Sequence, residues 1–286
     1  MRTYEELKQL LTQIKEADYS IPGNADADGI IEDMLKNIGH TCPVLRDDLI
    51  YPTLMTWCED GHISIDKVRY ILNTCIGEDY LFRGIGENGT DSVFTRTFSM
   101  LMIPVAFCVH DETPFLTDDE IANVKETVLR YIGMEKDFRS YIEGKGWSHS
   151  VSHTADALQN LAFVVGCNDT YEILDAVKSL ALNGVVPYDT DEGERLAEAA
   201  IAAFYATVCE KEDISVIEFC DWLKSISDVK IIRGTAHGIY TRLNRKNFVK
   251  SLYTKLLLDR DDFEDYQKEY DEVCKYLLEL LKELLA

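Results

Sequence analysis

The chain has 286 residues, of which 46% are hydrophobic, and this length and composition allow one or two domains with a substantial buried core. Its formal net charge is −22, from 51 acidic and 29 basic side chains. An acidic surface repels polyanions, so a nucleic-acid backbone and an anionic membrane are excluded as the main partner.

The first residues, 1–8, contain no apolar run of the kind that marks a signal peptide. The most apolar segment, 101–109, is far shorter than the ~20 residues that a membrane-spanning helix needs, and it contains Pro104. We therefore expect a soluble, cytoplasmic protein with no membrane partner.

Nearly every segment has the apolar spacing of a helix, with only six prolines in the chain and no convincing alternating strand. A capping box at Thr117 and Glu120 marks one helix start, and residues 84–89, which contain three glycines, form the clearest loop. The predicted helices are 3–15, 27–39, 46–59, 64–76, 91–110, 118–134, 147–165, 170–182, 190–209, 213–226, 235–257 and 262–285.

The predicted helices can be grouped in pairs that begin at residues 46, 91, 147, 190 and 235. Helical repeats of the HEAT and armadillo types have periods of ~40–47 residues, and three of the four intervals agree with this. We therefore predict an all-α fold of stacked antiparallel helix pairs, a HEAT/armadillo-like α-α superhelix, as a single domain over 1–286. The alternative is an irregular helical bundle.

Arg96 lies in a mostly apolar helix, where a guanidinium requires a carboxylate or an anionic ligand. Asp137 and Asp156 are the preferred partners, with Glu135 a further candidate. Arg139 follows Asp137 closely and suggests a second charged pair.

The segment 146–156 places Trp147, His149, His153 and Asp156 close together in the sequence. Read as a helix, positions 149, 153 and 156 fall within ~60° of one another. This polar stripe contains no Lys or Glu, unlike an ordinary solvated face, and could line a polar groove. The alternatives are a solvent-facing stripe and a metal site at His149 and His153. Because the Glu of the metalloprotease motif is absent and a third ligand would have to come from elsewhere, we expect no metal and no cofactor.

Two other features concern charge and sulfur. The segment 230–255 contains seven Lys or Arg and no acid, and docking on an acidic neighbour within the protein is preferred to nucleic-acid binding. Eight cysteines lack any Cys-x-x-Cys pair, so we expect reduced thiols, with Cys108, Cys167 and Cys209 buried and poorly reactive.

The pattern Gly-Trp-x-His-x-x-x-His-x-x-Asp at 146–156, with Asp-x-Arg-x-Tyr at 137–141 before it, resembles a bacterial family of uncharacterised proteins, domain-of-unknown-function family 2785. Residues 93–99 resemble a second block of that family, and residues 194–197 resemble a weaker third block. Ser140 and Thr154 stand where the family pattern has glycine. The resemblance implies a helical protein without an assigned activity.

The leading functional hypothesis is binding of a protein, a peptide or a small polar ligand in a polar groove. The competing hypothesis is an enzyme, a hydrolase with or without a metal ion, in which His149 or His153 acts as base or metal ligand and Arg96 holds an anionic substrate. The residues expected at the ligand are Arg96, Asp137, Arg139, Trp147, His149, His153 and Asp156.

Overall fold

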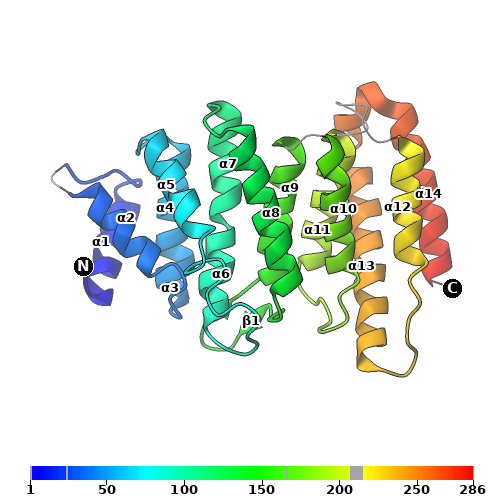
Figure 1. The fold of residues 1–286 in the computed structure, drawn as a ribbon, viewed down its shortest axis with the longest axis horizontal. Helices are drawn as coiled ribbons and strands as arrows, with labels where there is room; N and C mark the ends of the chain where they lie inside the picture. The colour runs from blue at the N-terminus through cyan, green and yellow to red at the C-terminus, as the bar shows by residue number, and fades with distance from the viewer. Residues whose placement is uncertain (1, 24, 165–166, 207–214, 286) are drawn as a thin grey trace. The chain divides into compact units, whose positions relative to one another are not determined.

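The computed structural model describes residues 2–23, 25–164, 167–206 and 215–285. Its Cα positions cluster in two compact units, 1–157 and 158–286, and each is described by itself. Helices form nearly all of the regular structure in these residues (Figure 1). The prediction of an all-α chain is confirmed.

The first unit begins with short helices and ends with a small hairpin and the start of α9. Its elements are α1 (Tyr4–Glu16), α2 (Ala27–Lys36), α3 (Pro43–Leu45), the π-helical turn η1 (Arg46–Ile50), α4 (Tyr51–Glu59), α5 (Ile65–Cys75), α6 (Ser92–Met100), α7 (Met102–Glu112), α8 (Asp118–Met134), β1 (Tyr141–Ile142), β2 (Gly146–Trp147) and α9 (Ser150–Val164).

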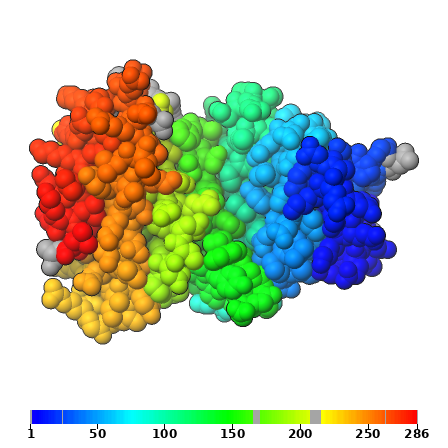
Figure 2. Space-filling model, turned by 180° about the vertical axis from the view of Figure 1, so that it is seen from behind, coloured from blue at the N-terminus to red at the C-terminus, as the bar shows by residue number. Residues whose placement is uncertain are grey.

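The second unit contains the remainder of α9 and further helical elements. These are α10 (Cys167–Ala181), α11 (Glu192–Phe204), α12 (Val216–Ser227), α13 (Ala236–Leu258), the 3-10 turn η3 (Arg260–Tyr266) and α14 (Gln267–Leu285). Helix α13 packs against both α11 and α14, and α13 and α14 lie side by side as the orange and red segments of Figure 2.

Local sequence signals explain where several helices begin. The Thr117 hydroxyl accepts the Glu120 N–H at 3.3 Å, and the Glu120 carboxylate accepts the Thr117 N–H at 2.8 Å, so the predicted capping box is present at the start of α8. The loop at 84–89 is also confirmed, and its three glycines have positive φ angles of 59°, 86° and 83°.

The hairpin β1–β2 is not expected from the sequence, and the predicted helix from residue 147 begins only at Ser150. Tyr141 pairs with Trp147 and Ile142 with Gly146 in an antiparallel register. Each strand has two residues, too few for alternation of polar and apolar side chains to be detected in a sequence. Trp147 therefore belongs to a strand.

One helical stretch, Ser92–Glu112, has the length and the composition of a membrane-spanning helix, with a mean hydropathy of 1.6. This stretch contains α6 and α7 and is longer than the apolar segment recognised in the sequence. Since 78% of its apolar 18-residue window is buried inside the protein, the stretch has the burial of an ordinary core helix.

The thiols differ from expectation at one position. Cys58 and Cys75 are buried and not disulfide-bonded, but Cys108 on α7 is exposed, so the prediction that Cys108 is buried is wrong. The apolar residues around Cys108 in the sequence belong to the buried face of α7, and Cys108 lies on its other face. Cys209 and the side chain of Cys167 lie outside the described residues.

Candidate functional site

The site is built on the hairpin, and Gly146 shapes it. Gly146 has a φ of 82°, a left-handed conformation that disfavours other residues. A Cβ atom there would lie 3.0 Å from the Pro43 Cβ and 3.2 Å from Nη2 of Arg46. Glycine is therefore needed both for the backbone conformation and for the close approach of Arg46.

Arg46 holds the hairpin from inside the unit. The residue is fully buried, its Nη2 donates to the carbonyl oxygens of Lys145 at 2.8 Å and Trp147 at 3.3 Å, and it pairs with Asp47 at 3.0 Å. Its guanidinium also lies over the rings of Phe94 and Phe98, 4.1 and 4.8 Å from their centroids. Sequence reasoning missed Arg46, although it follows an apolar stretch as Arg96 does.

Aromatic rings continue from the hairpin into the core. The indole of Trp147 contacts Tyr141 edge-on at 4.9 Å and stacks on the His149 ring at 4.5 Å with an interplanar angle of 7°. The His149 and His153 rings are 5.5 Å apart, and His153 meets Phe98 at 5.3 Å. Tyr141 is 53% and Trp147 40% exposed, whereas His153 is 9% exposed, so the row of rings begins in solvent and ends in the core.

His149 does not belong to the helix. Its φ is 44°, a conformation rare for a residue other than glycine, and it lies between β2 and α9. The Ser148 N–H donates to the Ser140 carbonyl at 2.7 Å, so extended pairing continues to residue 148 and the chain must turn at 149. The His149 carbonyl accepts the His153 N–H at 3.0 Å, which brings the two imidazoles together across the first turn of α9.

The polar stripe predicted for this helix is largely buried. His153 has its Nδ1 3.2 Å from the Thr97 carbonyl oxygen, and Ser148 and Ser152 are 0% and 2% exposed. Asp156 is half-buried. Among the described residues, no group of three or more His, Cys, Asp or Glu side chains could hold a metal ion.

Arg96 forms an ion pair, but not with either preferred partner. Its Nε donates to Glu135 Oε2 at 2.7 Å and its Nη2 to Oε1 at 2.9 Å, and both side chains are almost completely buried. The prediction of Asp137 or Asp156 is wrong because Glu135 directly follows α8 and faces α6. Burial acts to lower the pKa of Arg96, but the hydrogen bonds and charge of Glu135 outweigh it and raise that pKa.

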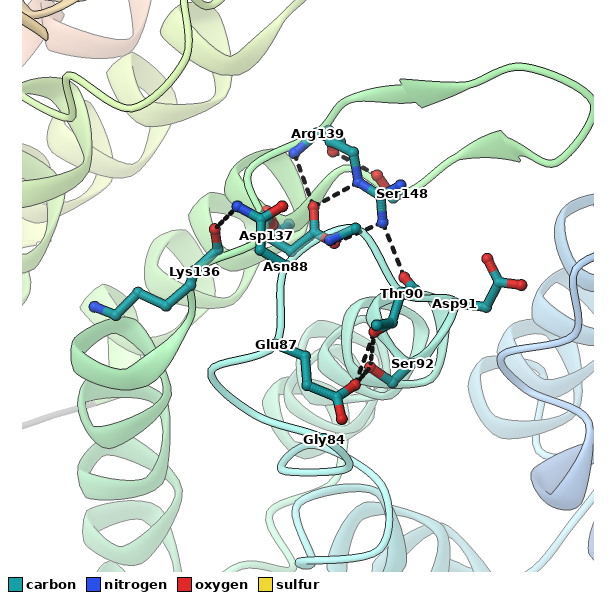
Figure 3. A network of polar contacts seen from close by, with 12 residues as sticks. Gly84, Glu87, Asn88, Thr90, Asp91, Ser92, Lys136, Asp137, Arg139 and Ser148 are labelled. Atoms are coloured by element: carbon teal, nitrogen blue, oxygen red, sulfur yellow. Dashed lines mark hydrogen bonds and ion pairs between the residues drawn. The ribbon is translucent and has the colours of Figure 1, made fainter.

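Asp137 is fully buried and pairs with Arg139 (Figure 3). Nε of Arg139 donates to Oδ1 of Asp137 at 2.8 Å and Nη2 to Oδ2 at 2.6 Å, which raises the pKa of Arg139. Oδ2 of Asp137 also accepts the Gly89 N–H at 3.0 Å, and Nη2 of Arg139 donates to the Thr90 carbonyl at 2.9 Å. The second charged pair suggested by the sequence is present, and it ties the loop at 84–90 to the segment before the hairpin.

A surface hollow of about 420 Å³ borders this network. Its wall includes Thr90 and Asp91, and Asp91 accepts from Nζ of Lys145 at 2.6 Å. Lys36, Arg83, His40 and Glu87 also line the hollow, which therefore carries charges of both signs. These residues come from segments far apart in the sequence, so no local motif indicates them.

A family model described as Protein of unknown function (DUF2785) matches residues 81–254. The chain belongs to this family. The matched region contains the polar network, the hairpin and both histidines. No curated protein and no solved structure matches the chain.

Proposed function

We propose that the protein binds a peptide or a small polar ligand at the surface formed by Tyr141, Trp147 and His149, beside the hollow that contains Asp91. The observation that carries this proposal is an exposed tryptophan stacked flat on a histidine whose backbone is in a left-handed conformation. Such a conformation costs about 1–3 kcal/mol, and residues that adopt it cluster at functional sites.

The fixed position of this surface supports recognition. Hydrogen bonds from Arg46 hold β2, and the Asp137–Arg139 pair holds the chain that leads into β1. An exposed aromatic ring that is already immobilised loses little entropy on binding, which is why such rings dominate binding energy at interfaces. Arg96, Asp137 and Arg139 then hold this surface in position, and the ligand contacts the aromatic rings.

The proposal extends to the whole chain as a single HEAT-like helical-repeat domain in the cytoplasm. Helices pack on second neighbours within each unit, α5 on α7 in the first and α11 on α13 and α12 on α14 in the second. This is the packing expected when successive helix pairs stack. The division between the units falls inside α9.

Tryptophan fluorescence tests the proposal, because Trp57 is fully buried and Trp222 is 7% exposed while Trp147 is 40% exposed. A library of short peptides and polar metabolites is screened for compounds that raise the melting temperature and change the emission of Trp147. We expect Trp147→Ala to abolish binding of such compounds and Tyr171→Ala, which removes an equally exposed ring from α10, to preserve it. Compounds that bind Trp147→Ala and wild type equally would refute this surface as the site.

A further inference from the structure

A cavity of about 610 Å³ lies in the second unit. It lies between the segment that joins α12 to α13 and the first turns of α13. Figure 1 shows this joining segment at the lower end of both helices. Its charged lining consists of three arginines, Arg233, Arg242 and Arg245, and its apolar lining includes Ile231 and Ile239. Among the described residues, no acidic side chain is part of this lining.

Two glycines allow the joining segment to fold over the beginning of α13. Gly234 has a φ of 82°, which favours glycine. A Cβ on Gly238, in the first turn of α13, would collide with the carbonyl of Ile232. The backbone conformation at these two glycines therefore fixes one wall of the cavity. The cavity lies beside the N-terminus of α13, a helix of 23 residues, where the helix dipole favours an anion.

Arg245 is the deepest of the three arginines, with 8% of its surface exposed. Its Nη1 donates to the carbonyl oxygens of Ser227 at 2.8 Å and Val229 at 3.3 Å, near the end of α12. Its Nε is buried without a hydrogen-bond partner, and no carboxylate of the described residues pairs with its charge. Burial and the neighbouring cation of Arg242 lower the pKa of Arg245, which is the response of a cation that lacks an anion.

The other two arginines are exposed and also form no ion pair in the part of the chain that the structure describes. Seven of the other nine arginines of the chain each pair with an acidic side chain: Arg2, Arg46, Arg69, Arg96, Arg130, Arg139 and Arg195. The basic segment docks on an acidic neighbour at its other end, where Lys255 pairs with Glu198 of α11 at 2.5 Å.

We propose that this cavity binds the phosphate group of a small organic phosphate, with Arg233, Arg242 and Arg245 around the phosphate and the apolar wall against its organic part. Guanidinium groups match phosphate oxygens in geometry, and a dianion neutralises the three cations better than one carboxylate does. The cavity is larger than a bare phosphate requires. A small ligand is favoured over a nucleic acid because the net charge of −22 repels a long polyanion, whereas salt screens that field beyond ~10 Å.

The test is calorimetric titration of the full chain with inorganic phosphate and with phenyl phosphate, at constant ionic strength, with chloride as reference. We expect saturable binding of both, tighter for phenyl phosphate, and at least a tenfold weaker affinity in Arg242→Gln and Arg233→Gln, since a charge-assisted hydrogen bond contributes about that factor. Both residues are exposed, so these variants should fold even if Arg245→Met does not. Arg260→Gln, which removes an exposed arginine outside the cavity, is the matched control and should bind as wild type does.

Three outcomes would overturn the proposal. The first is phosphate binding no tighter than that of chloride, and the second is a loss of affinity in Arg260→Gln as large as in Arg242→Gln. The third is binding of a single-stranded oligonucleotide where neither phosphate compound binds. Tighter binding of phenyl phosphate than of inorganic phosphate would assign the apolar wall to the ligand's organic part.

Discussion

The arginines near the hairpin of the first unit and the arginine cluster at the beginning of α13 in the second unit are used differently. In the first, Arg46, Arg96 and Arg139 each have a carboxylate within 3.0 Å. In the second, the cluster of Arg233, Arg242 and Arg245 has no ion pair among the described residues. A buried or half-buried guanidinium with its own carboxylate is part of the scaffold, whereas one without an anion has charge available for a ligand.

This difference changes how the charged residues of the family pattern are interpreted. The charged residues that the sequence presents as candidate ligand contacts, Arg96, Asp137 and Arg139, hold the loop at 84–90 and the hairpin in place. In the proposed function they position Trp147 and His149. The arginine cluster at the beginning of α13, which the sequence suggests as part of a docking surface, has the chemistry of an anion site.

The largest predicted effect is the loss of the buried pair in the first unit. Arg96→Met leaves the Glu135 carboxylate buried without its cation and should lower the free energy of unfolding by ~3–5 kcal/mol, measured by urea denaturation. Arg96→Met/Glu135→Gln should recover part of this loss because no uncompensated charge remains. Arg130→Met, which breaks the exposed pair with Glu78, should cost less than ~1 kcal/mol. A similar effect of Arg96→Met and Arg130→Met would contradict a structural role for Arg96.

The second prediction concerns the contact between the hairpin and Arg46. Gly146→Ala should destabilise by ~2–4 kcal/mol, because it adds a positive-φ penalty to a collision with Pro43 and Arg46. Gly144→Ala is the control and should cost ~1–2 kcal/mol, since Gly144 has a φ of 75° but no described atom within 4 Å of an added Cβ. Equal effects would mean that the close approach of Arg46 contributes nothing.

The helices were predictable because their signals are local. The range 118–134 agrees with α8 in both bounds, since a capping box starts the helix and apolar periodicity continues through it. The range 91–110 is expected as one helix, but the structure has a turn at Leu101 between α6 and α7. Composition alone does not reveal such a break.

The proximity of three residues of the candidate site was predictable from the sequence, but their geometry was not. The pattern at 146–156 correctly predicts that Trp147, His149 and His153 lie close together, but it assigns all three to one helix. The hairpin and the turn at His149 depend on Arg46, whose hydrogen bond to the Trp147 carbonyl spans 101 positions of the sequence. The partner of Arg96 likewise depends on how the end of α8 meets α6, which periodicity does not specify.

A third prediction uses pH to weaken an ion pair of the first unit. The hydrogen bond from Arg69 and that from the Thr117 N–H lower the pKa of Glu120 to about 2. This stabilisation is complete above the unfolded pKa of about 4.3 and is lost as the pH falls toward 2. Because both side chains are about one third exposed, Glu120→Gln should cost only ~1 kcal/mol at pH 7. The difference between wild type and variant should shrink between about pH 4.5 and about pH 2.5, and an unchanged difference would contradict the depressed pKa.

The smallest effect is expected in the second unit, where Arg242→Gln removes a cation that has no carboxylate partner among the described residues. Without ligand, the free energy of unfolding should stay within ~0.5 kcal/mol of the wild-type value. Any difference should be an increase, because the variant removes the repulsion between Arg242 and Arg245. Urea denaturation at low and high salt measures this, and the gain should vanish at ~1 M salt, where charges are screened beyond ~3 Å. A loss above ~1 kcal/mol would show that Arg242 stabilises the fold as Arg96 does. The cluster at the beginning of α13 would then be part of the scaffold, as the arginines near the hairpin are.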